Sequence, residues 1–347
     1  MSTTAVPHVS IIIPCRNEAR FIADCLDSIL ASGYDQAHLE LLVVDGMSDD
    51  GTREILDAYA GRHPIVRILN NERRITPVAL NLGLAVASGE IVMRMDAHVR
   101  YPPEYIPRLV EWLQRSGADN VGGVCRTVPG DETPTARGIA LVLAHPFGVG
   151  NAHFRIGVRE PRWVDTVPFG CYWREVFTRI GMFDEALVRN QDDELNARLI
   201  RSGGRILLVP DVVSQYYARR SLRQLARMYY QYGFFKPLVV RKVGGVLTGR
   251  QLVPAAFILA LGSALVLSTL SAGFAIAGVV LAALYLLAVL ACAVALAVKH
   301  GARTALAAAA AFPVLHLSYG VGFLRGVPGA LRRIPRARDA SAIPVSR

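Results

Sequence analysis

The stretch Ile91-Val92-Met93-Arg94-Met95-Asp96-Ala97-His98 joins an apolar run to a polar ending. An earlier apolar run, residues 39–45, also ends in a carboxylate, Asp45. Apolar, β-branched runs of this length are typical of strands that are buried on both faces of a parallel sheet. Two such strands bring their terminal carboxylates to the carboxyl edge of the sheet, where open α/β sheets bind nucleotides. The stretch therefore predicts an α/β fold with a nucleotide site at that edge.

Strands and helices alternate along the first 130 residues. Apolar β-branched runs predict the strands, and apolar positions spaced three and four residues apart predict amphipathic helices between them. The predicted strands are residues 9–14, 39–45, 66–69, 89–96 and 121–127. The first strand is not followed by the Gly-x-Gly-x-x-Gly fingerprint, which argues against a Rossmann dehydrogenase.

Charge divides the chain into two parts. Charged residues are frequent up to Arg250, whereas none occurs from Gln251 to Val298, which is too long a stretch for a core helix and predicts membrane segments. The first eight residues show no secretory signal pattern, so we expect the N-terminal domain in the cytoplasm. The formal charge of +10 comes without a recognisable nucleic-acid-binding module. It therefore indicates anionic lipid and phosphate-bearing substrates as partners, and no nucleic acid.

The cysteines do not indicate a disulfide framework or a zinc site. The chain has five, an odd number, and no Cys-x-x-Cys pair. We expect reduced, structural thiols.

Four polar motifs follow the predicted elements in order. They are Pro14-Cys15-Arg16-Asn17-Glu18, the run 43–52 (VVDGMSDDGT), Asp96-Ala97-His98 and Asn190-Gln191-Asp192-Asp193-Glu194. With these motifs, residues 9–235 resemble glycosyltransferase family 2. The runs 81–83, 94–98, 122–129 and 146–150 are similar to those of succinoglycan-type exopolysaccharide glucosyltransferases. The resemblance implies a GT-A nucleotide-diphospho-sugar transferase domain with a mostly parallel central sheet, followed by C-terminal transmembrane helices.

The nucleotide-sugar contacts are predicted at the first two motifs and at Asp96. Asp45 can accept a hydrogen bond from a pyrimidine ring N–H, and Glu18 can accept one from a nearby hydroxyl or order the loop. The resemblance implies nucleotide contacts for both, with Pro14 and Arg16 lining the same loop. The alternative is that Asp45 caps the following turn and Glu18 begins a helix.

Asp96 and His98 are the predicted metal ligands. Residues i and i+2 at the end of a strand point to the same side, so both side chains can approach one cation on the donor diphosphate. The family usually carries Asp-x-Asp here, and His98 is a departure from that pattern. Imidazole suits Mn²⁺ better than Mg²⁺, so we expect Mn²⁺ to work at least as well as Mg²⁺. The alternative is that Asp96 binds the metal largely alone.

Asp192 is the predicted catalytic base. The apolar pair Leu195 and Leu199 places Asp192 at the start of a helix, whose dipole favours a carboxylate whether or not it is catalytic. The resemblance implies that Asp192 deprotonates an acceptor hydroxyl during in-line attack with inversion, and Asp193 is the competing candidate. A polyprenyl monophosphate needs no base. An intact Asp192 therefore favours transfer onto a lipid-linked sugar.

Six further residues are candidates for the acceptor site. In the segment 167–173 (VPFGCYW), Gly170 allows close approach of the backbone and Trp173 can stack on a sugar, although a core role for Phe169 and Trp173 is an equal alternative. Arg126 and Arg155 can hold an acceptor diphosphate or lie on the solvated surface. Arg227 and Tyr229 belong to a basic, aromatic segment that is typical of a helix lying in the lipid headgroup region.

The predicted organisation has four parts. Residues 1–218 form the cytoplasmic GT-A domain, 219–250 an interfacial amphipathic helix region, 251–326 a membrane domain, and 327–347 a basic tail. Residues 252–270 and 274–298 are long enough to span a membrane, and 304–324 either spans or re-enters. Basic residues flanking the first two spans predict cytoplasmic ends, whereas a complete third span would place the basic tail outside, against the positive-inside rule. We expect two or three hydrophobic helices in a multi-pass protein of the bacterial inner membrane.

These features lead to one hypothesis and two alternatives. The hypothesis is a metal-dependent, inverting transferase that moves a sugar, with glucose favoured by the resemblance, from a UDP-sugar to a hydroxyl of a polyprenyl-diphosphate-linked saccharide. The first alternative is a polyprenyl-phosphate glycosyl synthase. The second is a catalytically inactive membrane assembly subunit, favoured only by His98 and Gln191 at positions where the family usually carries acidic residues.

Overall fold

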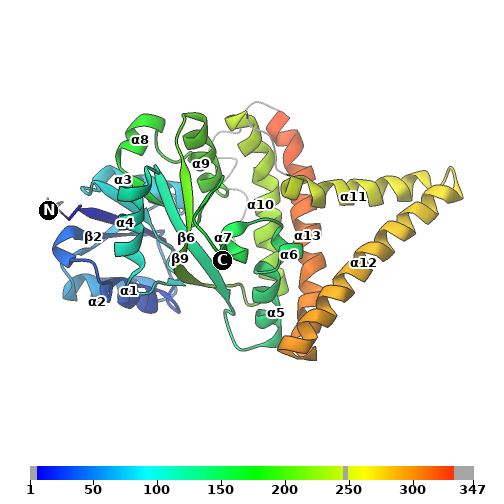
Figure 1. Ribbon diagram of the computed structural model, residues 1–347, viewed down its shortest axis with the longest axis horizontal. Helices are drawn as coiled ribbons and strands as arrows, with labels where there is room; N and C mark the ends of the chain where they lie inside the picture. The colour runs from blue at the N-terminus through cyan, green and yellow to red at the C-terminus, as the bar shows by residue number, and fades with distance from the viewer. Residues whose placement is uncertain (1–5, 245–248, 332–347) are drawn as a thin grey trace.

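The computed structural model describes residues 6–244 and 249–331, so that most of the predicted basic tail lies outside the described residues. A mixed sheet with helices on both faces forms the N-terminal body, and helices alone form the C-terminal part (Figure 1). The strand order is β3-β2-β1-β4-β8-β6-β9-β5, with β7 paired to β9. The expected α/β class is confirmed.

The first four strands are parallel, and all but the edge strand β3 are buried, as their apolar runs predict. They are β1 (Val9–Cys15), β2 (Leu39–Asp45), β3 (Val66–Asn70) and β4 (Ile91–Arg94). The other half of the sheet is mixed, because β8 runs antiparallel to both β4 and β6. Its strands are β5 (Val99–Arg100), β6 (Asn120–Val128), β7 (Arg162–Trp163), β8 (Cys171–Trp173) and β9 (Ile206–Tyr217).

Two layers of helices cover the sheet and separate its core into two clusters. One face carries α1 (Ile22–Leu30), α2 (Thr52–Arg62) and α4 (Tyr105–Ser116). The other carries α3 (Thr76–Val86), α8 (Glu175–Ile180) and α9 (Gln191–Arg201). A short 3₁₀ helix, η1 (Gln36–His38), leads into β2. Burial on both sides explains why the central strands lack polar alternation.

The helical part begins with three short helices that lie beside the sheet. These are α5 (Pro134–Leu143), α6 (Pro146–Val149) and α7 (His153–Ile156). Four long helices follow: α10 (Leu222–Val243), α11 (Gly249–Leu267), α12 (Ala272–His300) and α13 (Ala302–Leu331). In Figure 1, α11 and α12 project from the body as a hairpin, while α13 runs alongside α10.

Helix α10 differs from its predicted setting. We expected its apolar face to lie among lipid headgroups, but the structure covers that face with α13 and α5, and Leu225, Met228 and Tyr229 are buried there. Glycines allow this close contact, because a Cβ added to Gly233 would lie 2.0 Å from the carbonyl oxygen of Tyr319. Small residues at such positions let two helix backbones approach closely.

The hydrophobic helices divide into one projecting pair and one packed helix. Two helices of the described chain, α12 and α13, are long and apolar enough to cross a membrane, whereas the apolar part of α11 is shorter, residues 251–267. The residues predicted to span or re-enter, 304–324, lie inside the continuous helix α13. Exposed apolar side chains are concentrated on α11 and α12, which is the surface expected in contact with lipid.

Candidate active site

Hydrogen bonds join the loops after β1 and β2 into one rim at the carboxyl edge of the sheet. The backbone N–H of Asn17 donates to Ser48 Oγ at 2.9 Å, and that of Glu18 donates to Thr52 Oγ1 at 2.7 Å. Gly46 N–H donates to the Cys15 carbonyl at 2.7 Å. Asn17 and Met47 have positive φ, a conformation that non-glycine residues rarely adopt outside functional loops. The rim is therefore ordered by its own contacts.

Of the predicted nucleotide residues at this rim, Glu18 and Asp45 are buried, whereas Pro14 and Arg16 are half-buried. Asp45 accepts from Ser48 Oγ at 2.6 Å, so the capping role that the sequence left open is present. The carbonyl of Glu18 accepts from the first residues of α1, and its carboxylate lies 3.3 Å from His98 Nδ1. Arg16 packs against Gly46. The Asp45 and Glu18 carboxylates can still contact a ligand, since each can accept several hydrogen bonds.

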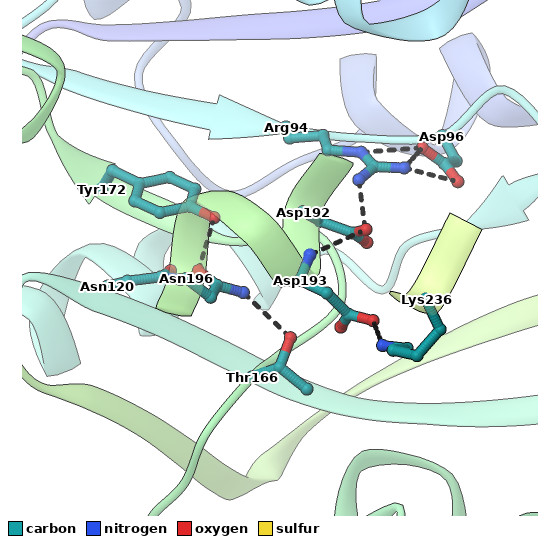
Figure 2. Close-up of polar contacts among 9 residues, drawn as sticks. All are labelled: Arg94, Asp96, Asn120, Thr166, Tyr172, Asp192, Asp193, Asn196 and Lys236. Atoms are coloured by element: carbon teal, nitrogen blue, oxygen red, sulfur yellow. Dashed lines mark hydrogen bonds and ion pairs between the residues drawn. The ribbon is translucent and has the colours of Figure 1, made fainter. Parts of the chain in front are cut away.

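Arg94 links two of the predicted site carboxylates. Its Nη2 lies 3.1 Å from Asp96 Oδ1, and its Nη1 lies 3.1 Å from Asp192 Oδ2 (Figure 2). Asp96 follows β4 and Asp192 begins α9, so one guanidinium connects two segments 98 positions apart. Burial alone would raise the pKa of Asp96, but Arg94, followed by His98, outweighs it and holds that pKa below its ordinary value.

Asp192 and Asp193 differ in their partners. Asp193 forms an ion pair with Lys236 of α10, a lysine that is only 7% exposed. Burial raises the pKa of Asp192; Arg94 opposes the shift and the neighbouring Asp193 adds to it. A carboxylate with a raised pKa in a cavity is a suitable proton acceptor. These contacts favour Asp192 over Asp193 for that role.

A buried amide network fixes helix α9 against the sheet. Asn196 Oδ1 accepts from Asn120 Nδ2 at 3.0 Å and from the Tyr172 hydroxyl at 3.2 Å, and Asn196 Nδ2 donates to Thr166 Oγ1 at 2.9 Å (Figure 2). Asn196 lies one helical turn after Asp192, so the network fixes the position of that carboxylate too.

Asp96 and His98 offer an oxygen and an imidazole nitrogen to a cation. The described residues contain no group of three or more His, Cys, Asp or Glu side chains arranged to hold a metal. The pair therefore fits a divalent ion only together with other ligands, such as the diphosphate oxygens of a donor, and this mixed donor set is one that Mn²⁺ accepts.

A cavity of about 550 Å³ extends from these residues to the C-terminal helices. Its polar end contains Arg94, Asp96, His98 and Asp192. Its other end is lined by aromatic and apolar residues of α6 and of the three hydrophobic helices: Phe147, Phe257, Tyr285, Leu315 and Tyr319. The polar residues and the apolar passage thus line one cavity, as in many ligand sites.

The predicted acceptor residues have different locations. Tyr229 lines the cavity, and so does Arg155. Trp173 pairs with Ile91 at the opposite end of β4 from the site and packs in the core, which agrees with the core alternative. Gly170 does not line the cavity, although Val167, Pro168 and Phe169 of the same predicted segment do. Arg126 and Arg227 are exposed and outside it.

Sequence reasoning missed Arg94, Lys236, Arg189 and Arg219, all of which line the cavity. For Arg94 a signal was present, because it precedes Asp96 by two residues, the spacing that we used for Asp96 and His98. For Lys236 there was none, since its pairing with Asp193 depends on how α10 packs against α9.

Comparisons with known proteins agree with this geometry. Residues 10–179 match the family model described as glycosyl transferase family 2. The succinoglycan biosynthesis protein ExoA of Rhizobium meliloti is 31% identical over 93% of this chain and 96% of its own length. A dolichyl N-acetyl-alpha-D-glucosaminyl phosphate 3-beta-D-2,3-diacetamido-2,3-dideoxy-beta-D-glucuronosyltransferase of Methanococcus voltae is 28% identical over 67% of this chain and 74% of its own length.

A solved structure extends the similarity to the fold. The mannosyltransferase PcManGT from Pyrobaculum calidifontis, in complex with GDP-Man and Mn²⁺, is 25% identical to this chain. The match has a TM-score of 0.58 and covers 91% of this chain and 88% of that one.

Proposed function

Because the chain belongs to glycosyltransferase family 2, we propose that it is a membrane-bound, inverting transferase that extends a polyprenyl-diphosphate-linked saccharide with a sugar, glucose being favoured, from a UDP-sugar donor. The observation that carries this proposal is the single cavity, which joins Asp96 and Asp192 to an apolar passage between α11, α12 and α13. A donor that meets a lipid-linked acceptor needs both kinds of surface.

The donor is proposed to bind along the rim and the end of β4. Asp45 and Glu18 would accept hydrogen bonds from the uridine, with Pro14 and Arg16 beside them. Asp96 and His98 would hold Mn²⁺, or less favourably Mg²⁺, which stabilises the negative charge of the departing diphosphate. The structure of PcManGT in complex with GDP-Man and Mn²⁺ supports a divalent ion in the donor complex.

Asp192 is proposed to act as the general base. An acceptor hydroxyl in the cavity gives its proton to the Asp192 carboxylate while its oxygen forms a bond to the anomeric carbon. The bond from that carbon to the diphosphate oxygen breaks on the opposite side, so the configuration inverts and UDP leaves. The hydrogen bond from Arg94 Nη1 would keep the carboxylate oriented toward this carbon.

The polyprenyl-phosphate glycosyl synthase is a second candidate for a specific reason. The cavity contains Arg155, Arg189 and Arg219 near the proposed base, and these arginines could place a lipid phosphate itself at the anomeric carbon. Such an acceptor is already anionic and would not need Asp192 as a base.

The proposed membrane arrangement follows from the exposed apolar surface. Residues 1–218 would lie in the cytoplasm at the inner membrane of a bacterium, with the hairpin of α11 and α12 inserted in lipid. Helix α10, in the region 219–250, would connect the two parts through its contact with α13. The paths of α13 and of the basic tail across the membrane stay predictions.

Release of UDP by the purified full-length protein tests this function. The assay contains detergent, Mn²⁺ and UDP-glucose, and compares a membrane-lipid extract with undecaprenyl phosphate as acceptor. We expect release with the extract, reduced about 10²- to 10⁴-fold in Asp192→Asn. Asp211→Asn is the matched control, because Asp211 contacts Trp112 on the exposed surface. Turnover on undecaprenyl phosphate that survives Asp192→Asn would identify the lipid-phosphate synthase instead.

A further inference from the structure

Three arginines besides Arg94 line the cavity: Arg155, Arg189 and Arg219. Arg155 donates to Thr127 Oγ1 at 3.3 Å, and its guanidinium lies 5.1 Å from the ring centre of Tyr216. Arg189 donates to the Gln231 side chain at 3.1 Å, and Arg219 follows β9. The contacts of Arg155 with Thr127 and Tyr216 are with neutral groups, so they orient its guanidinium without neutralising its charge.

Arg189 and Arg219 are close enough to repel each other. Burial lowers the pKa of Arg189, nearby Tyr232 opposes that shift, and the charge of Arg219 lowers it further. Within the described part of the chain, the buried Nε of Arg219 has no hydrogen-bond partner. A buried donor without a partner and two adjacent like charges are both unfavourable, and an anion between them would relieve both.

Tyr232 locates this cluster relative to the proposed base. Burial and Tyr216 raise the pKa of Tyr232, Arg189 and Arg155 lower it, and Asp192 adds to the increase. The same side chain is therefore within electrostatic range of two of the arginines and of Asp192. These arginines are therefore near the proposed base, whereas the ion pair with it in the described part of the chain is made by Arg94.

The other end of the cavity is apolar and opens among the hydrophobic helices. The rings of Phe257 on α11 and Tyr285 on α12 lie 4.7 Å apart. His316 on α13 hydrogen-bonds the Tyr285 hydroxyl and the Phe147 carbonyl, each at 2.9 Å, and so ties these helices to α6. The outer faces of α11 and α12 are exposed and apolar.

We propose that Arg155, Arg189 and Arg219 form the binding site for the diphosphate of an isoprenoid lipid acceptor, whose first isoprene units contact Phe257 and Tyr285. Guanidinium groups bind phosphate oxygens in pairs and so fit a diphosphate well. The inference rests on the proposed function and deepens it, because it assigns the acceptor's anionic group to residues separate from those of the donor.

The test measures binding of farnesyl diphosphate to the full-length protein in detergent by titration calorimetry. Saturating UDP and Mn²⁺ are present, so that the donor edge is already occupied. We expect Arg155→Gln and Arg219→Gln each to weaken binding about tenfold or more, since each removes charge-assisted hydrogen bonds. UDP affinity should stay unchanged in both variants, which also shows that they are folded. Arg115→Gln, on the exposed face of α4, is the matched control.

Four results would contradict the inference. They are equal affinity of the wild type and the two arginine variants, absence of farnesyl diphosphate binding to the wild type, equally tight binding of farnesol, and equally tight binding of inorganic diphosphate. The third would mean that charge is not recognised, and the fourth that the hydrocarbon is not. Failure of the wild type to bind UDP at all would instead contradict the proposed function. The two failures are therefore distinguishable.

Discussion

The proposed donor edge, which comprises the loops after β1 and β2 with Arg94 and Asp96, and the proposed acceptor end of the cavity are built in different ways. At the donor edge, the loops after β1 and β2 hold each other through hydrogen bonds across 31 to 34 positions. At the acceptor end, the wall is assembled from α6, α7 and the C-terminal helices, and His316 bonds to a carbonyl 169 positions away. A parallel sheet fixes the first region, whereas packing between helices fixes the second.

This difference makes Arg94 the junction between the two regions. Arg94 and Asp96 belong to the donor edge, while Asp192 belongs to a helix that contacts α10 through Asp193 and Lys236. One guanidinium therefore joins Asp96, on the proposed leaving-group side, to Asp192, the proposed base. We therefore expect a substitution of Arg94 to affect both regions, and a substitution elsewhere in one region to affect only that region.

Arg94→Met should have the largest effect. It leaves two carboxylates without their shared cation, and loss of one partner of a buried pair costs about 3 to 5 kcal/mol, less where solvent reaches Asp192. Misplacement of the base should lower kcat at least about a hundredfold. Steady-state kinetics and thermal unfolding of the purified protein measure the two effects.

Two variants sharpen that result. Arg100→Met, at the exposed position of β5, should change neither kcat nor the unfolding temperature. The double variant Arg94→Met with Asp192→Asn should lose less activity than the product of the two single losses, because Arg94 acts partly through Asp192 and partly through Asp96. Losses that multiply in full would mean that Arg94 does not act through Asp192.

His98→Asp should have a smaller effect, confined to the donor edge. The wild type should use Mn²⁺ at least as well as Mg²⁺, and chelation of the metal should stop transfer. An added carboxylate favours the harder ion, so the ratio of the rates with Mn²⁺ and Mg²⁺ should fall on the order of tenfold. His98→Asn supplies an oxygen without charge and is the control. An unchanged ratio in both variants would remove His98 from the ligand set.

The donor edge was predictable from sequence because its signals are local. Strand β2 has the predicted bounds, and Asp45 and Asp96 lie where strands or their extensions end. The GT-A class followed from four motifs in order. Even here the prediction was incomplete, because the antiparallel strand β8 contains only three residues and carries no periodic signal.

The acceptor end was mostly not predictable. Trp173 and Gly170 come from a segment that looked like a substrate loop, yet the pairing of β8 places Trp173 at the far end of β4. The apolar face of α10 looked suited to lipid, but α13 covers it. An amphipathic pattern predicts that one face of a helix is buried, but it does not predict whether lipid or another helix covers that face.

Gly233→Ala should destabilise the acceptor end with little effect on the donor edge. The added Cβ would lie 2.0 Å from the Tyr319 carbonyl oxygen, so α10 and α13 must separate. Overpacking of this kind costs about 1 to 3 kcal/mol, which should lower the unfolding temperature while UDP affinity is retained. Gly262→Ala on α11 is the control, since its Cβ would meet nothing within 4 Å. Loss of UDP affinity in Gly233→Ala would show that the two regions are coupled.

Cysteine labelling compares the accessibility of thiols in the two regions without any substitution, and it should show the smallest difference. Cys15, Cys25, Cys125 and Cys171 are buried in the catalytic domain, whereas Cys292 on α12 is partly exposed. Burial raises the pKa of Cys125 to about 11, so its reactive thiolate is scarce at neutral pH. We expect N-ethylmaleimide to label Cys292 first, and all five thiols only after unfolding, as intact mass would show. Rapid labelling of a second thiol in the native protein would mean that the sheet opens more readily than its packing indicates.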